Sequence, residues 1–146
     1  MNWDEYFINI AEQVKLKSKD IKTQIGVVLV GKDNSIVSTG YNSFPRGIND
    51  DIDERQERPE KYFWFEHAER NAIYNAARIG VSTLGTTMYM TCDISCADCA
   101  RGIISAGITK VVFRKSTKPW PEIWIQSAQR SNQMFKEAGG IVEYYD

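Results

Sequence analysis

The chain has 146 residues, of which 42% are hydrophobic and 25% are charged, values typical of a globular protein with a sizeable core. Its net charge of −1 argues against a nucleic-acid backbone as the main partner, because domains that bind one usually carry a basic excess. No apolar run approaches the roughly 18 residues of a membrane span, and the first ten residues lack the basic start of a signal peptide, so we expect a cytoplasmic protein without a membrane partner.

Hydrophobic periodicity predicts nine elements in the order α-β-β-α-β-α-β-α-β. In chain order they are a helix at 3–17, strands at 23–31 and 35–42, a helix at 65–80, a strand at 86–91, a helix at 96–107, a strand at 110–114, a helix at 121–139 and a strand at 141–145. In the second half strands alternate with helices, which predicts parallel pairing with right-handed crossovers. We therefore expect one domain, residues 1–146, with the architecture of a three-layer α/β/α sandwich around a five-stranded mixed sheet.

The segment SFPRGINDDIDERQERP, residues 43–59, combines proline, glycine and charges of both signs, which predicts a long surface loop. A loop of this length inside a compact domain is often functional.

All three cysteines lie in TCDISCADCA, residues 91–100. An odd number of cysteines packed so closely does not form a disulfide framework, and a cytoplasmic protein keeps its thiols reduced. Cys96 and Cys99 form a C-x-x-C, which alone is compatible with a redox pair, half of a zinc site or coincidence. The pair follows a predicted strand and opens a predicted helix, so its local setting does not exclude the redox pair.

The only histidine of the chain, His67, stands in HAE at the start of another predicted helix. His67, Cys96 and Cys99 together would form a three-ligand site whose donors suit zinc, and such a site leaves a fourth position open, as catalytic zinc sites do. Cys92 is the one candidate for a fourth soft ligand, and we interpret it as a small buried hydrophobic residue.

Helix geometry supports the pairing of the two motifs. Side chains two residues apart diverge in the middle of a helix, but all side chains of a first turn can reach an object on the helix axis. We therefore expect a metal ion between two helix N-termini, whose partial positive charges favour thiolates. Glu69 would lie beside the open position without binding the metal, where a carboxylate can move protons to and from a water molecule. This arrangement predicts hydrolytic attack on an amidine-like ring carbon.

HAERNAIYNAA (67–77) and CADCARGIISAGITKVVF (96–113) resemble the cytidine/deoxycytidylate deaminase superfamily, whose signature is H-x-E followed by P-C-x-x-C. SKDIKTQIGVVLV (18–30) and STGYNSFPRG (38–47) are similar to the deoxycytidylate (dCMP) deaminase branch. The resemblance covers about residues 3 to 114.

The resemblance implies a cytidine deaminase-like fold, one catalytic Zn²⁺ ion and hydrolysis of dCMP to dUMP and ammonia, which supplies thymidylate synthesis. Glu69 would protonate N3 of cytosine and then the leaving amino group. The backbone N–H groups of Ala68 or of the C-x-x-C motif would bind the base carbonyl, and Asn42 would reach the sugar. The candidates for the sugar-phosphate end are Lys22, Thr23 and Arg46.

The resemblance also bears on assembly and on further metals. Members of the family are often hexamers controlled by dCTP and dTTP, so we expect a homo-oligomer, with a hexamer as one form. The turn near which the family holds the regulatory nucleotide reads GYNS instead of GYNG, which puts this control in question. Some members bind a second, structural zinc in the long loop. This chain has no spare histidine and no cysteine between residues 43 and 66, so we expect no second zinc.

Two further features of the sequence lead to predictions. Ser95 occupies the place of the usual proline, and we interpret it as the N-cap of the following helix, with Asp98 completing a capping box. Trp120 and Trp124, in KPWPEIW, are expected to be core or subunit contacts and not a platform on which a base stacks.

Three other functions remain open. A tRNA adenosine deaminase would use the same chemistry, but it needs a basic, aromatic groove that the composition does not favour. A deaminase of another small molecule, such as a riboflavin precursor or cytidine, fits the metal site equally well. A zinc-stabilised binding module would supply a fourth ligand in place of Glu69 and an open position.

Overall fold

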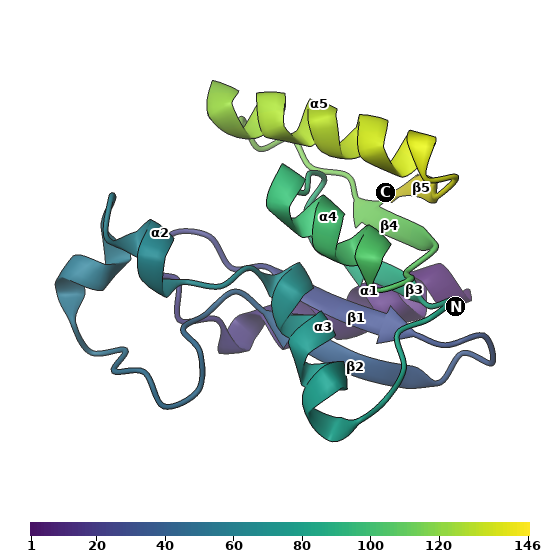
Figure 1. The fold of residues 1–146 in the computed structure, drawn as a ribbon, viewed down its shortest axis with the longest axis horizontal. Coiled ribbons are helices and arrows are strands. Elements are labelled where there is room, and N and C mark those ends of the chain that lie inside the picture. The colour runs from purple at the N-terminus through teal and green to yellow at the C-terminus, as the bar shows by residue number, and fades with distance from the viewer.

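Five strands form one mixed sheet in the order β2-β1-β3-β4-β5 in the computed structural model, which describes residues 1–146 (Figure 1). β1 pairs antiparallel with both β2 and β3, whereas β3, β4 and β5 run parallel. The mixed sheet and the parallel second half were both predicted. The strand bounds are β1 Gly26–Val30, β2 Ile36–Tyr41, β3 Thr87–Met90, β4 Lys110–Arg114 and β5 Ile141–Tyr145.

The helices are α1 Trp3–Val14, α2 Lys61–Trp64, α3 Ala68–Ile79, α4 Ala97–Ser105 and α5 Glu122–Glu137, with short 3₁₀ turns at Lys15–Lys17 and Asp53–Gln56. Every predicted element is present, and its bounds differ by three residues at most outside the 3₁₀ turn that ends the first helix. The short helix α2 and the turn before it were not predicted, because this charged stretch has no clear hydrophobic period. None of the helices combines the length and the apolar composition that crossing a membrane requires.

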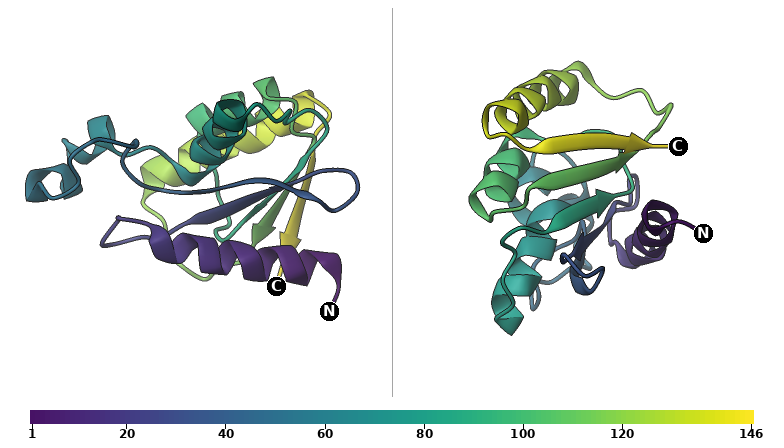
Figure 2. Two further views of the ribbon diagram at one scale, coloured as in Figure 1. Left: turned by 90° about the horizontal axis from the view of Figure 1, so that it is seen from below. Right: turned by 90° about the vertical axis from the view of Figure 1, so that its right-hand side faces the viewer.

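The sheet lies between α1 on one face and α3, α4 and α5 on the other (Figure 2). Each face has its own cluster of buried apolar side chains, because alternate residues of a strand point to opposite faces. The α1 face contains Phe7, Ile8, Ala11, Val28, Val30, Tyr89 and Val112. The opposite face contains, among others, Val27, Leu29, Ala72, Met88, Met90, Ile103, Val111, Phe113 and Phe135. This three-layer arrangement confirms the predicted fold class.

α3 is fastened to the open edge of the sheet. β2 is an edge strand, and in an antiparallel pair the carbonyl groups of alternate residues point away from the partner strand. Asn71 Nδ2 donates to Tyr41 O at 2.8 Å, and Asn75 Nδ2 donates to Thr39 O at 2.7 Å. The two asparagines are one helical turn apart and therefore reach the strand side by side. Arg46 Nη1 donates to Asn75 Oδ1 at 2.7 Å, which fixes the orientation of that amide.

The same helix approaches the backbone of β2 closely. An ideal Cβ on Gly40 would lie 2.4 Å from Ala72 N and 2.5 Å from Ala68 O, so only glycine fits between strand and helix here. Ser38 Oγ donates to Ala72 O at 2.7 Å from a buried position. Strand β2 thereby fixes the position and the orientation of α3, the helix whose N-terminal end carries His67 and Glu69.

Candidate metal centre and catalytic cavity

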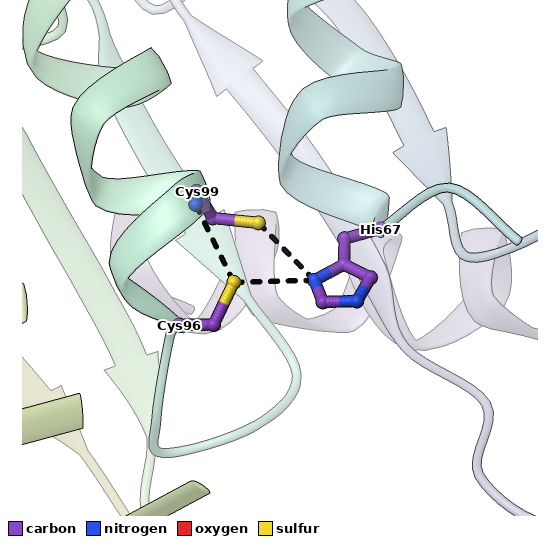
Figure 3. A group of neighbouring side chains, drawn as sticks. All are labelled: His67, Cys96 and Cys99. Atoms are coloured by element: carbon purple, nitrogen blue, oxygen red, sulfur yellow. Dashed lines mark hydrogen bonds between the residues drawn. The ribbon is translucent and has the colours of Figure 1, made fainter. Parts of the chain in front are cut away.

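The structure brings His67, Cys96 and Cys99 together, with their ligand atoms all within 4.8 Å of one another (Figure 3). His67 Nδ1 lies 3.4 Å from Cys96 Sγ and 3.3 Å from Cys99 Sγ. A tetrahedral zinc ion with ordinary bond lengths separates a nitrogen and a sulfur ligand by about 3.6 Å. The donor set and the spacing both fit a zinc ion.

Two helix N-termini converge on this group, as the sequence predicted. His67 is the N-cap residue of α3 and Cys96 that of α4, and both have extended backbone angles. Cys99 lies in the first turn of α4, and its N–H donates to Cys96 Sγ at 3.4 Å. The unpaired N–H groups of both first turns give the site a positive potential that favours bound thiolates.

The two cysteines differ in their protonation. A hydrogen bond from the Cys99 thiol lowers the pKa of Cys96 to about 4 against the opposing effect of burial, and His67 lowers it further. The hydrogen bond to Cys96, together with burial, raises the pKa of Cys99 far above its ordinary value. Without a metal the pair therefore holds one thiolate and one thiol. A divalent ion bound by both sulfurs must displace the Cys99 proton.

The pKa of His67 reflects opposing effects as well. Burial lowers the pKa of its imidazole, but the hydrogen bond with Cys96 and the negative charge of Glu69 outweigh burial, and the pKa lies above its ordinary value. A metal at Nδ1 therefore also competes with a proton on His67.

Glu69 is the second residue of α3 and is buried close to the candidate metal ligands. It is not one of the three ligands, but it lines the cavity that His67 and Cys96 also line. Its Oε2 accepts a hydrogen bond from Ser95 Oγ at 2.7 Å. Cys92 is also outside the ligand group: its thiol donates to Ile94 O at 3.0 Å, and burial raises its pKa. The geometry agrees with the interpretation of Cys92 as a buried residue that binds no metal.

The interpretation of Ser95 as a helix N-cap was wrong. α4 begins one residue later than that role requires, and Cys96 takes the cap position with its own sulfur. The Ser95 hydroxyl points to Glu69 instead. Asp98 completes no capping box; its carboxylate pairs with Arg101 and lies 3.9 Å from Arg70.

The metal group opens into a cavity of about 530 Å³, within the range of sites that bind small molecules. Part of its wall is aromatic: Tyr62, Phe65, Trp120 and Trp124 all line it. Trp124 meets the His67 ring edge-on with 6.1 Å between centroids, and Trp120 Nε1 donates to Asp93 Oδ1 at 2.8 Å. Trp120 also packs against the core cluster on the α3, α4 and α5 face, as expected, but the sequence analysis did not predict that both tryptophans line the cavity. Their position just after a parallel strand, β4, could have indicated the cavity, because α/β proteins bind ligands at the carboxyl ends of strands.

Four lysine and arginine side chains line the cavity: Arg58, Lys61, Arg70 and Lys118. Arg70 Nε lies 2.7 Å from Glu66 Oε1. Lys61 Nζ is paired with Asp20 Oδ2 at 2.8 Å, whereas Arg58 and Lys118 form no ion pair. Lys118 Nζ donates to Thr23 Oγ1 at 2.8 Å. No local sequence pattern indicates these residues, because they come from segments far apart in the chain that only the fold brings together.

Asn42 lines the cavity, but its amide is fully engaged within the protein. Oδ1 accepts from Ser18 Oγ and Ile25 N, both at 2.8 Å. Nδ2 donates to Thr23 O at 2.7 Å and to Asp20 Oδ2 at 3.3 Å. In this conformation Asn42 therefore holds the loop before β1 in place.

The remaining predicted substrate residues divide into two groups. Thr23 and Ala68 line the cavity, whereas Lys22 and Arg46 do not. The backbone N–H groups of Lys22 and Thr23 both donate to Asp20 Oδ1, and this turn leaves the Lys22 side chain exposed. Arg46 donates to Asn75 of α3. In this structure Lys22 and Arg46 therefore lie outside the cavity lining.

Comparison with known proteins identifies related sequences. Residues 1–115 match the model of the family described as "Cytidine and deoxycytidylate deaminase zinc-binding region". An uncharacterized deaminase from the luxG 3′ region of Aliivibrio fischeri is 39% identical over 94% of this chain and 89% of its own length. Human deoxycytidylate deaminase is 38% identical over 77% of this chain. The chain spans only 65% of the human protein.

The fold has a counterpart among solved structures. The dCMP deaminase of the cyanophage S-TIM5, in its apo form, superposes with a TM-score of 0.75 at 25% identity, covering 97% of this chain and 96% of the phage protein. The likeness therefore extends past the matched family region to β5.

Proposed function

Because the chain belongs to the cytidine and deoxycytidylate deaminase family, we propose that it hydrolyses dCMP to dUMP and ammonia. The observation that carries this proposal is the convergence of His67, Cys96 and Cys99 with a buried carboxylate, Glu69, that is not one of the ligands. A structural site would use a fourth protein ligand, whereas three ligands leave a position for a reacting molecule.

Zinc bound by the three residues would act as a Lewis acid that makes a water molecule nucleophilic at neutral pH. Glu69 would accept a proton from the water that attacks C4 of the pyrimidine and deliver it to N3. It would then move the second proton of that water, now on the hydroxyl at C4, to the amino group. The C4–N4 bond breaks as the C4 carbonyl forms, and the amino group leaves as ammonia. Burial in the cavity strengthens these interactions, because the local dielectric is lower than that of water.

The charged residues of the cavity support a nucleotide as the substrate. Arg58 and Lys118 line it without carboxylate partners, and Thr23 Oγ1 lies beside the Lys118 ammonium. Such donors suit a phosphate group. We assign the 5′-phosphate to Lys118, Thr23 and Arg58 in place of Lys22 and Arg46. Trp120, Trp124 and Tyr62 offer apolar surface for the base and the sugar.

One zinc ion per chain is part of this proposal. The chain has a single histidine and all three cysteines are accounted for, two as ligands and Cys92 as a buried thiol. The homo-oligomeric state and the cytoplasmic location expected from the sequence stay predictions.

The test is ammonia release by the zinc-loaded protein from dCMP, CMP, deoxycytidine and a tRNA anticodon stem, with Glu69→Ala as the control. We expect turnover of dCMP well above the other three and none in the control. Preferred turnover of the tRNA stem or of deoxycytidine would contradict the assigned substrate, and equal turnover by Glu69→Ala would contradict the proton transfer.

A further inference from the structure

Ser95 is placed where it can control the carboxylate of Glu69. Its Oγ donates to Glu69 Oε2 at 2.7 Å, and both side chains are only 3% exposed. Oε1 of Glu69 accepts no hydrogen bond from the protein, and Glu69 lines the cavity. The two oxygens of the carboxylate are therefore in different situations, one anchored and the other free to meet a ligand.

Ser95 is itself rigidly held. Its carbonyl oxygen accepts from Ser131 Oγ at 2.7 Å, and Ser131 is fully buried on α5. Two residues later, Ala97 N donates to Ser127 Oγ at 2.8 Å on the same helix. The segment that carries Ser95 is thus fixed against α5 on one side while its hydroxyl fixes Glu69 on the other.

We propose that Ser95 is a positioning residue for proton transfer: its hydroxyl holds Oε2 of Glu69, so that Oε1 alone faces the substrate and carries the proton. The terminal torsion of a glutamate is broad and roughly two-fold, so an unanchored carboxylate would sample many orientations and exchange its oxygens. A hydrogen bond to a charged group is among the stronger ones in proteins, and a catalytic group needs support of this kind to keep its geometry.

The contact depends on the residue type at position 95. The zinc deaminase signature has proline before its first cysteine, and proline has neither a hydroxyl nor an N–H to donate. The serine of this chain therefore adds a donor beside Glu69 that the signature residue could not supply. The proposal rests on the proposed function, because it assigns the proton transfer to Glu69.

The experiment compares Ser95→Ala, Ser95→Thr and a matched control, Thr86→Val, in steady-state deamination of dCMP. Thr86 is also a buried residue whose hydroxyl donates to a backbone carbonyl, Thr83 O at 2.7 Å, but it precedes β3 and lies at the opposite end of that strand from Ser95. We expect Ser95→Ala to lower kcat about 10-fold or more with KM changed less than about twofold, which is the pattern for an interaction that acts in the transition state. Ser95→Thr, which keeps the hydroxyl, should recover most of kcat, and Thr86→Val should have the kcat of the wild type.

Two measurements are independent of turnover. Zinc content should stay at the wild-type level in Ser95→Ala; a loss of zinc in proportion to activity would overturn the proposal in favour of a structural role. A double-mutant cycle of Ser95→Ala with Glu69→Ala, measured by the melting temperature of the metal-free protein, should be non-additive by roughly 2–4 °C.

The outcomes separate this proposal from the proposed function. An unchanged kcat in Ser95→Ala, or an additive cycle, would overturn the role of Ser95 while dCMP turnover by the wild type stands. A wild-type protein without turnover of any compound would overturn the function and the catalytic role of Ser95 together. The cycle would identify that case, because it detects the contact between Ser95 and Glu69 without any reaction.

Discussion

Gly40→Ala should move the helix that carries the candidate active site. The added Cβ would lie 2.4 Å from Ala72 N and 2.5 Å from Ala68 O, both backbone atoms of α3. Restoring an ordinary contact distance of 3.4 Å requires strand and helix to separate by about 1 Å, because close-packed interiors have no room to absorb the methyl group. Overpacking of this kind costs about 1–3 kcal/mol of unfolding free energy. Displacing a catalytic group by about 1 Å can lower kcat roughly 100-fold.

Urea unfolding and dCMP turnover measured on the same preparations test this reasoning. Gly31→Ala is the matched control, because an ideal Cβ there has no neighbour nearer than 3.6 Å and the residue does not have a positive φ. The control should equal the wild type or exceed its stability by up to about 1 kcal/mol, since alanine reduces the entropy of the unfolded chain. A Gly40→Ala protein with the stability and activity of the Gly31→Ala protein would refute the account of how β2 positions α3.

Three further predictions follow from the site. Lys118→Met should lower kcat/KM for dCMP about 10- to 100-fold and leave any turnover of deoxycytidine unchanged, whereas Lys22→Met should behave as the wild type. Equal losses of kcat/KM in the two variants would contradict the assignment of the phosphate to Lys118. The pKa of Cys99 is raised, so its proton is bound in the metal-free protein at neutral pH and must leave when zinc binds. Zinc affinity, measured by competition with a chromogenic chelator, should therefore fall at least about 10-fold for each unit by which the pH is lowered from 8 to 6. An affinity that does not change with pH would contradict the pairing of one thiol with one thiolate. Asn42→Ala should lower the free energy of unfolding by about 1–3 kcal/mol, because it leaves buried donors and acceptors of the loop before β1 without partners. Thermal unfolding measures this, and a variant as stable as the wild type would contradict the role of this network.

The metal ligands were predictable because their positions are set locally. Cys96 and Cys99 are three residues apart at the start of one helix, and His67 is the only histidine and stands at the start of another. A first turn offers all its side chains to a point on the helix axis, so spacing in the sequence was enough to predict the convergence. The start of α3 was predicted three residues too early, because the apolar period of the helix continues back to Phe65 in the sequence. That ring packs against Phe44 with 4.3 Å between centroids and takes no part in the helix.

The residues that line the cavity could not be predicted with the same success, because they depend on tertiary distances. Lys22 and Lys118 are both exposed lysines in polar segments, and nothing local indicates that only Lys118 lines the cavity. The role of Ser95 was missed for the same reason. A serine before a helix usually caps it, and the competing partner, Glu69, lies 26 residues earlier in the chain. Only the packing of α3 beside α4 reveals which partner the hydroxyl binds.

The asparagine pair on α3 has a consequence for how molecules of this protein meet one another. An edge strand with free carbonyl groups can template a strand from another molecule, which is a route to aggregation. At Thr39 and Tyr41 those carbonyls already accept hydrogen bonds from Asn75 and Asn71, so an intruding strand would have to displace both amides before it could pair. The helix that supports the candidate active site therefore also shields β2 from polymerisation, and a chain that loses these two amides would be expected to stay folded in dilute solution yet precipitate as its concentration rises.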